Sequence, residues 1–193
     1  MNSNDRQLKI GIVGAAGGRG ESYRDAFESS NARIHALCDI EAHALEQQGA
    51  KLGVSEIYTD YGQMLENSAL DAVVIATPMP LHAPQAIMAL ERNISVLSEV
   101  PAAVSVEECR ALVQAASRSQ ALYMMAENYL FMRPNLLVTE LVREGLFGEV
   151  YYAEGEYLHE LKELNDVTTW RRQWQTGLPG VTYGTHSLGP ILQ

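Results

Sequence analysis

A glycine-rich turn near the N-terminus constrains the fold of this 193-residue chain more than any other feature. The apolar run Leu8–Val13 leads directly into Gly-Ala-Ala-Gly-Gly-Arg-Gly at positions 14–20. The spacing is G-x-x-G-x-x-G, or A-x-G-x-x-G read from Ala15, and it is close to the dinucleotide-binding pattern G-x-G-x-x-G. Glycines let the backbone turn sharply beside a pyrophosphate, and the helix that follows offers free N–H groups. The pattern predicts a buried strand, a phosphate-binding turn and a helix over residues 20–30; a tight turn without a ligand is the alternative.

An acidic residue favours the dinucleotide interpretation. Asp39 follows the apolar segment Ala32–Cys38 and lies about 20 residues beyond the glycine turn. A carboxylate at this position accepts hydrogen bonds from ribose hydroxyls and repels the 2′-phosphate of NADP. We therefore expect NAD as the cofactor. Asp39 can also cap the helix predicted over residues 40–52, and the two roles are compatible.

Strands and helices alternate regularly through residue 128. Predicted strands cover residues 8–13, 32–38, 56–59, 72–76, 94–97 and 122–125. Predicted helices cover residues 20–30, 40–52, 61–66, 84–92 and 106–119, with caps at Gly53, Asp60 and Ser105. The alternation predicts an α/β fold, a Rossmann doubly wound parallel sheet, over residues 1–128.

The pattern changes in residues 129–193. A helix is predicted over residues 134–144, a tyrosine-rich strand over residues 150–158, and a further helix near His186. One strand and two helices cannot form an independent sheet domain. We expect this region to be the start of a truncated α/β second domain, cut short or completed by another chain.

Composition limits the classes of partner. The formal net charge of −10 disfavours nucleic acid and anionic membrane surfaces. No apolar run is long enough for a membrane span, and the polar N-terminus does not look like a signal peptide. The two cysteines, Cys38 and Cys109, form neither a disulfide framework nor a zinc site. We expect both to be buried and reduced in a cytoplasmic protein without a metal site.

Two loops follow predicted strands and carry polar residues. Thr77 and Pro78 lead to His82, and Glu99 lies two residues before Pro101. Ligands of open parallel sheets lie across the carboxyl ends of the strands, so both loops are placed to touch the cofactor. For His82 alone, packing at a helix start is the more common role.

The order and spacing of several motifs resemble the Gfo/Idh/MocA family of NAD(P)-dependent sugar oxidoreductases. They are Ala-Thr-Pro at 76–78 with His82, Glu-Val-Pro at 99–101 and Gly-x-x-Gly-Glu at 145–149. The resemblance runs from Ile10 to about Pro190. It implies a Rossmann domain and an α/β domain whose open sheet covers the nicotinamide and builds the oligomer interface. A sugar substrate and a homo-oligomer are therefore expected, in proteins considerably longer than this chain.

Two positions depart from that family pattern. Val100 replaces the lysine of the family's Glu-Lys-Pro, and Thr182 replaces an aspartate, whereas His186 keeps the family histidine. By the resemblance, the lysine helps to move the proton of the substrate hydroxyl. A dehydrogenase needs a base for that proton as the hydride leaves. Two of the usual polar groups for this task are therefore missing.

The same region resembles one branch of the family, glycoside hydrolase family 109, whose members are NAD-dependent α-N-acetylgalactosaminidases. The shared motifs lie at residues 99–103, 127–129, 157–159, 170–171 and 183–190, and the run 158–162 departs from the branch. The resemblance implies transient oxidation at the sugar C3, loss of the C2 proton and elimination at C1. It matches four residues to active-site positions: Glu127, Tyr157, Tyr183 and His186. A tyrosine at position 157 could equally serve strand packing.

The predicted cofactor site combines the glycine turn, the strand ends and the matched motifs. Its residues are Gly14, Ala16, Gly17, Gly18, Arg19, Gly20, Asp39, Thr77, Pro78, His82, Glu99, Val100, Pro101 and Asn128. Three functions stay open. The first is a sugar oxidoreductase that releases reduced cofactor, the second is an NAD-dependent glycosidase, and the third is an NAD-binding fragment without catalysis.

Overall fold

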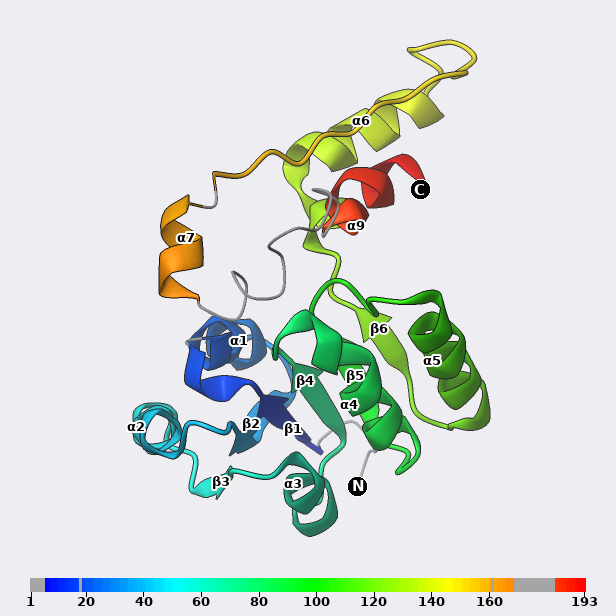
Figure 1. The fold of residues 1–193 in the computed structure, drawn as a ribbon. Coiled ribbons are helices and arrows are strands. Elements are labelled where there is room, and N and C mark those ends of the chain that lie inside the picture. Colours follow the sequence, from blue (N-terminus) through cyan, green and yellow to red (C-terminus); the bar gives the residue numbers. More distant parts are fainter. Residues whose placement is uncertain (1–5, 18, 161, 169–182) are drawn as a thin grey trace. The chain divides into compact units, whose positions relative to one another are not determined.

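The computed structural model describes residues 6–17, 19–160, 162–168 and 183–193. The chain divides into two compact units, Met1–Met125 and Ala126–Gln193. Figure 1 colours the first from blue to green and the second from yellow-green to red. Gly18, the Trp-Arg pair at 170–171 and Thr182, which the sequence singled out, lie outside the described residues.

The first unit is built on a six-stranded sheet of order β3-β2-β1-β4-β5-β6. The strands are β1 (Leu8–Val13), β2 (Ala32–Cys38), β3 (Glu56–Tyr58), β4 (Ala72–Ile75), β5 (Ser95–Ser98) and β6 (Tyr123–Met125). Every neighbouring pair is parallel. This order is that of the doubly wound dinucleotide-binding fold, with β1 at the centre and the strand order reversing between β1 and β4. The predicted fold class is confirmed.

Helices cover both faces of this sheet (Figure 1). One core layer packs α1 (Arg19–Glu28) and α2 (Ala42–Leu52) against the sheet, with Ile12 and Val74 at its centre. The other layer packs α3 (Tyr61–Asn67), α4 (His82–Leu90) and α5 (Val106–Arg118), with Val73 and Ile75 facing them. Residues 73, 74 and 75 alternate between the layers because successive side chains of a strand point to opposite faces.

The caps read from the sequence are present. Gly53 ends α2 in the left-handed conformation with φ 68°, and the Asp60 carboxylate accepts the backbone N–H of Gln63 at the start of α3. Ser105 caps α5 by accepting the N–H of Glu108, and the Glu108 carboxylate accepts from the N–H of Val104. α4 begins two residues earlier than predicted, at His82. Pro84 is tolerated there because the first N–H groups of a helix need no partner within it.

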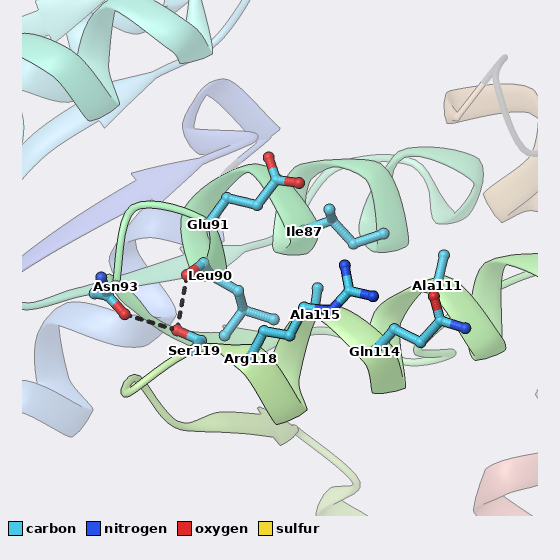
Figure 2. A pocket seen from close by; sticks show the side chains of 9 residues that line it. All are labelled: Ile87, Leu90, Glu91, Asn93, Ala111, Gln114, Ala115, Arg118 and Ser119. Atoms are coloured by element: carbon cyan, nitrogen blue, oxygen red, sulfur yellow. Dashed lines mark hydrogen bonds between the residues drawn. The ribbon is translucent and has the colours of Figure 1, made fainter.

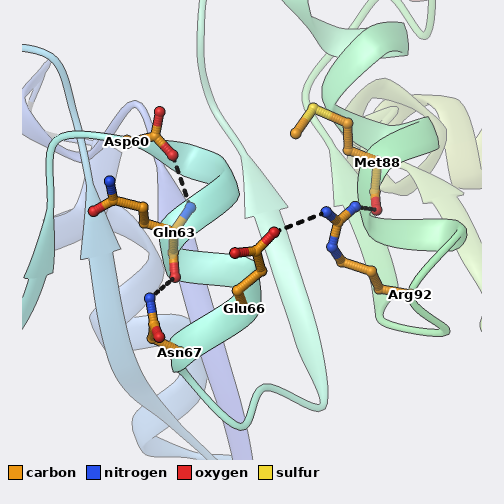
Figure 3. A network of polar contacts seen from close by, with 6 residues as sticks. All are labelled: Asp60, Gln63, Glu66, Asn67, Met88 and Arg92. Atoms are coloured by element: carbon orange, nitrogen blue, oxygen red, sulfur yellow. Dashed lines mark hydrogen bonds and ion pairs between the residues drawn. The ribbon is translucent and has the colours of Figure 1, made fainter.

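A small polar network joins α3 to the end of α4 (Figure 3). The Arg92 guanidinium donates to the Met88 carbonyl at 3.0 Å and lies 3.4 Å from the Glu66 carboxylate. Both charged side chains are substantially exposed, with the Glu66 side chain at 64%. An exposed ion pair of this kind contributes about 0–1 kcal/mol, so the apolar layers and not this network hold the unit together.

The second unit contains short helical elements and one long extended segment. The helical elements are η3 (Asn128–Phe131), α6 (Arg133–Arg143), α7 (Lys162–Val167), α9 (Gly184–Leu188) and η4 (Gly189–Ile191). Gly155, in the extended segment, passes against the carbonyl oxygen of Ser187, where a Cβ would have no room. The segment therefore runs tightly along α9.

Two expectations from the sequence are wrong. Residues 150–158 do not form a strand, and Tyr151 and Tyr152 are 96% and 70% exposed. A strand needs a hydrogen-bonded neighbour, and no other described segment pairs with this one. Cys109 is exposed on α5, whereas Cys38 is buried in β2 as expected. Cys109 lies on the solvent-facing side of α5. The residue type alone does not show which side of a helix a cysteine occupies.

Candidate functional site

Two glycines of the turn have different surroundings: Gly14 is tightly packed, and Gly17 borders open space. Gly14 has φ 82°, and a Cβ there would lie 2.5 Å from the Ala76 carbonyl oxygen and 2.8 Å from the Thr77 nitrogen. Only a glycine permits this approach between the β1 and β4 ends. A Cβ at Gly17 would meet nothing within 4 Å. Gly17 is therefore the place where a pyrophosphate can lie directly against the backbone.

Asp39 lies at the carboxyl end of β2 and reaches the glycine turn. Its Oδ2 accepts the backbone N–H of Ala16 at 2.8 Å, and its Oδ1 accepts the N–H of Glu41 at 3.1 Å. The expected capping role of Asp39 is wrong, because α2 begins at Ala42 with Glu41 as its N-cap residue and without a side-chain cap hydrogen bond. The contact with Ala16 places the carboxylate beside the phosphate-binding turn. Open space at Gly17 with a carboxylate at the same turn fits a dinucleotide that has a free ribose 2′-hydroxyl.

The loops after β4 and β5 complete this edge of the sheet. The Thr77 hydroxyl donates to Gln85 at 2.6 Å, and the Glu99 carboxylate accepts from the Tyr23 hydroxyl of α1 at 2.8 Å. Val100, where the family has lysine, is buried. Both ring nitrogens of His82 contact backbone carbonyl oxygens, which favours the packing role over a direct ligand role for this residue.

In the second unit, the structure brings the four predicted catalytic residues into one cluster. The Glu127 and His186 side chains are 4% and 8% exposed, and Glu127 Oε1 lies 2.6 Å from His186 Nδ1. The Tyr157 ring meets the His186 ring edge-on, with centroids 4.8 Å apart. The Tyr183 ring is parallel to the imidazole, with centroids 5.6 Å apart. Residues distant in sequence thus surround one buried acid–imidazole pair.

Tyr129 belongs to the same cluster and was not among the predicted site residues. Its ring stacks on the imidazole of His186 at 4.3 Å, and its backbone N–H donates to Glu127 Oε1 at 3.1 Å. The signal that could have found it is the spacing, because Glu127 is the N-cap of η3 and its carboxylate accepts the N–H of the residue two positions later. Asn128, predicted to touch the cofactor, is the exposed first residue of η3.

The pair is arranged for proton transfer. His186 Nδ1 donates to the carboxylate, which fixes the ring orientation and leaves Nε2 for another partner. Glu127 Oε2 is buried and has no hydrogen-bond partner among the described residues. An unpartnered buried carboxylate oxygen is costly in a folded protein and marks a candidate site of chemistry.

The remaining features of the described residues do not point to another site. A cavity of about 440 Å³ lies between α4 and α5, and Figure 2 shows Ser119 bridging Leu90 and Asn93 at one end of it. These residues lie near the start of β5, the opposite sheet edge from the glycine turn. Within the described ranges, no group of three or more metal-ligating side chains is placed to hold a metal ion. No described helix has the length and apolarity needed to cross a membrane.

The sheet order, the glycine turn and Asp39 define a dinucleotide-binding domain of the oxidoreductase type. The model of the Gfo/Idh/MocA oxidoreductase family, described as an NAD-binding Rossmann fold, matches residues 8–127. The chain belongs to this family, and its cofactor is NAD. The family resemblance read from the sequence is confirmed.

Two curated relatives belong to the glycosidase branch. The chain is 37% identical to the α-N-acetylgalactosaminidase of Shewanella oneidensis over 204 residues, which cover 96% of this chain and 44% of the relative. It is also 37% identical to a glycosyl hydrolase family 109 protein of Shewanella woodyi, covering 96% and 43%. The chain thus spans less than half the length of these relatives.

Solved structures show the same fold. The myo-inositol 2-dehydrogenase of Lactobacillus plantarum superposes with a TM-score of 0.85 at 21% identity, covering 95% of this chain and 55% of that chain. The WlbA dehydrogenase of Bordetella pertussis, solved with NADH and UDP-GlcNAcA, superposes with a TM-score of 0.75 at 26% identity, covering 86% and 51%. At 21% identity, the likeness to the myo-inositol 2-dehydrogenase shows only that the fold is shared.

Proposed function

We propose that this chain provides the cofactor-binding domain and part of the active site of an NAD-dependent glycosidase acting on α-N-acetylgalactosaminides or related glycosides. The buried Glu127–His186 pair within a tyrosine cluster carries the proposal. Val100, where an ordinary dehydrogenase of the family has lysine, supports it. The 37% identity to a named α-N-acetylgalactosaminidase supports the substrate class.

The residues of the first unit would hold the cofactor. Gly17 leaves room for the pyrophosphate, and Asp39 would accept the ribose hydroxyls. Bound NAD supplies the ability to take a hydride from a sugar carbon and to return it. Because the hydride is returned, a glycosidase of this kind consumes no cofactor over a cycle.

The residues of the second unit would move protons. A ketone beside the sugar C2 makes the C2 proton acidic, so elimination needs a base at that carbon and an acid at the leaving oxygen. The Glu127–His186 pair offers a carboxylate and an oriented imidazole in a buried setting. Tyr157 and Tyr183 place phenol groups around the same imidazole.

A net sugar dehydrogenase is the second candidate. Membership of an oxidoreductase family favours it, as does the likeness to WlbA at 26% identity. The same buried pair could accept the hydroxyl proton when hydride leaves. An NAD-binding chain without catalysis is the third outcome, because the chain spans 44% of its relative.

Heavy water separates the candidates. An enzyme that contains this chain with a complete second domain is given NAD and p-nitrophenyl α-N-acetylgalactosaminide in deuterium oxide. We expect release of nitrophenol, a product deuterated at C2, and no accumulation of reduced nicotinamide absorbance. Steady formation of NADH from the free sugar, without glycoside cleavage, would establish the dehydrogenase instead. Binding of NAD with neither reaction would favour the third outcome.

We also propose that the enzyme is a cytoplasmic homo-oligomer. Cys38 and Cys109 are free thiols, which is compatible with a reducing compartment. The apolar side chains exposed on α6, among them Leu137 and Val138, leave surface for further chain or for a partner copy.

A further inference from the structure

His82 is a buried titratable residue at the cofactor edge for which the proposed reaction has no use. It begins α4, and its side chain is 1% exposed. Nδ1 lies 2.8 Å from the carbonyl oxygen of Pro101, and Nε2 lies 2.7 Å from the carbonyl oxygen of Thr77. The two carbonyls belong to different loops, one after β4 and the other after β5. The ring therefore bridges two loops that border the cofactor site.

Both partners of the ring are hydrogen-bond acceptors. A neutral imidazole donates from one nitrogen and presents a lone pair on the other, and a carbonyl oxygen cannot donate to that lone pair. At 2.7 and 2.8 Å, one of the two contacts would then set lone pair against lone pair. Only the imidazolium form donates to both oxygens.

Two effects oppose a charge at this position. Burial removes the ring from water, and the N-terminal end of α4 carries partial positive charge. Against them stand two short hydrogen bonds from a cationic donor, which are stronger than bonds between neutral groups. A neutral ring would leave one partly buried backbone carbonyl without a donor from the ring, a cost that the doubly protonated form avoids.

We propose that His82 carries a proton on each ring nitrogen in the folded protein and positions the loops that border the NAD site, without touching NAD itself. His82 is thus a positioning residue for cofactor binding. The proposal rests on the NAD-binding fold and holds whether the enzyme is a glycosidase or a dehydrogenase.

The contacts continue on both sides of the ring. Thr77 lies against the glycine turn, because a Cβ at Gly14 would be 2.8 Å from its nitrogen. On the other side, Glu99 lies two residues before Pro101 and accepts from the Tyr23 hydroxyl of α1. The glycine turn, the β4 loop, the β5 loop and α1 are therefore joined in one series, in which His82 connects the two loops. Loss of the His82 contacts would let the β4 and β5 loops move apart at the sheet edge where NAD would bind.

Nitrogen NMR of the intact 193-residue chain, labelled with ¹⁵N-histidine, tests the protonation state. At neutral pH we expect one of the five histidine rings to show two protonated nitrogens with slowly exchanging protons. These signals should be missing from His82→Gln and should persist when NAD is added. A His82 ring with a single protonated nitrogen would overturn the proposal. Magnetisation transfer between NAD protons and the His82 ring would overturn the positioning role.

Calorimetric titration with NAD tests the positioning role separately. The amide of His82→Gln can donate to one of the two carbonyls, so the dissociation constant for NAD should rise roughly tenfold, the equivalent of one lost hydrogen bond. His43→Gln is the matched control, because His43 is exposed on α2, and its NAD affinity should not change. Unchanged affinity in a folded His82→Gln chain would contradict the proposal. If that variant does not fold, the NMR spectra of the unaltered chain decide.

Discussion

Asp39 has structural contacts in the folded chain in addition to its proposed contact with the cofactor. Asp39 holds the glycine turn and the start of the next segment with its two oxygens. Sequence pattern alone placed this carboxylate at a strand end, because strand ends follow from short-range apolar runs. Its contact with Ala16 could not be predicted from the sequence, because it forms only when the ends of β1 and β2 lie side by side in the folded chain.

Substitution of Asp39 should separate its charge from its structural contacts. Asp39→Ala should weaken NAD binding by about 1–3 kcal/mol, because hydrogen bonds to a charged acceptor are lost. Asp39→Asn keeps one acceptor oxygen without the charge, so it should bind NADP better relative to NAD than the parent does. Calorimetry with both cofactors measures this. Asp60→Ala, which removes a helix cap on α3, should leave NAD affinity unchanged. Tighter binding of NADP than NAD by the unaltered chain would refute the assignment of Asp39.

The two cysteines should differ in reactivity. Burial and the neighbouring carboxylate of Asp39 raise the pKa of Cys38 to about 12, so its thiol stays protonated and inert well above neutral pH. Cys109 is exposed. A thiol reagent at pH 8 should modify one cysteine in the native chain and two after denaturation. Rapid modification of two thiols in the native chain would show that β2 is not buried as described.

The proposed catalytic role of the cluster around His186 can be tested by substitutions in the second unit. His186→Ala and Tyr183→Phe should lower turnover of the complete enzyme by about 10²–10⁴-fold if they act in proton transfer. NAD affinity should stay close to that of the parent, because neither residue belongs to the glycine-turn unit. Tyr58→Phe, at the edge of the first unit, is a control that should affect neither quantity. An equal loss of NAD affinity and turnover in His186→Ala would point to a folding defect.

At the scale of elements, local sequence signals predicted the strands and caps of the first unit correctly. Contacts between segments distant in sequence could not be predicted in this way. The strands from Leu8 to Met125 followed from apolar runs, and the cap at Gly53 followed from a glycine that tolerates positive φ. The caps at Asp60 and Ser105 followed from side chains that accept a backbone N–H three residues later. The prediction of a strand over residues 150–158 was wrong. A strand-like sequence shows that a segment could join a sheet, but it does not show whether a neighbouring strand is present. Tyr129 was missed for the same reason, because its stacking on His186 depends on the return of the chain 57 residues later.

The glycine turn offers a matched pair of substitutions. Gly14→Ala should lower the free energy of unfolding by about 1–3 kcal/mol from backbone strain alone, because φ is 82°. The new Cβ would also lie 2.5 Å from the Ala76 backbone, which adds to this loss. Gly17→Ala should leave stability nearly unchanged, because its Cβ meets nothing, yet it should weaken NAD binding by filling the space beside the turn. Thermal unfolding and NAD titration measure the two effects. A Gly17→Ala chain with full NAD affinity would place the pyrophosphate elsewhere.

At the scale of the whole molecule, exposed backbone and apolar side chains predict self-association. Residues 150–158 are extended and largely exposed, with Tyr151 96% and Leu158 85% accessible. Residues 150–156 belong to no strand of the structure, and the backbone N–H and C=O groups of such a segment can pair with another chain. Light scattering should show oligomers or aggregates at high concentration, and Tyr151→Lys should reduce them by placing a charge on the segment. A monodisperse monomer at high concentration would count against this.

The position of β1 in the middle of the sheet has a consequence for synthesis on the ribosome. Val13 pairs with Cys38 on one side and with Ile75 on the other. Until the segment to Ile75 has left the exit tunnel, the central strand lacks one of its two neighbours and one side of its hydrogen bonds. Folding of the nascent chain must therefore wait on a contact of long sequence separation, which slows folding and prolongs the exposure of an apolar strand. A chaperone that binds short apolar stretches should accordingly recognise ribosome-bound chains that end before Ile75 and release those that extend beyond Met125.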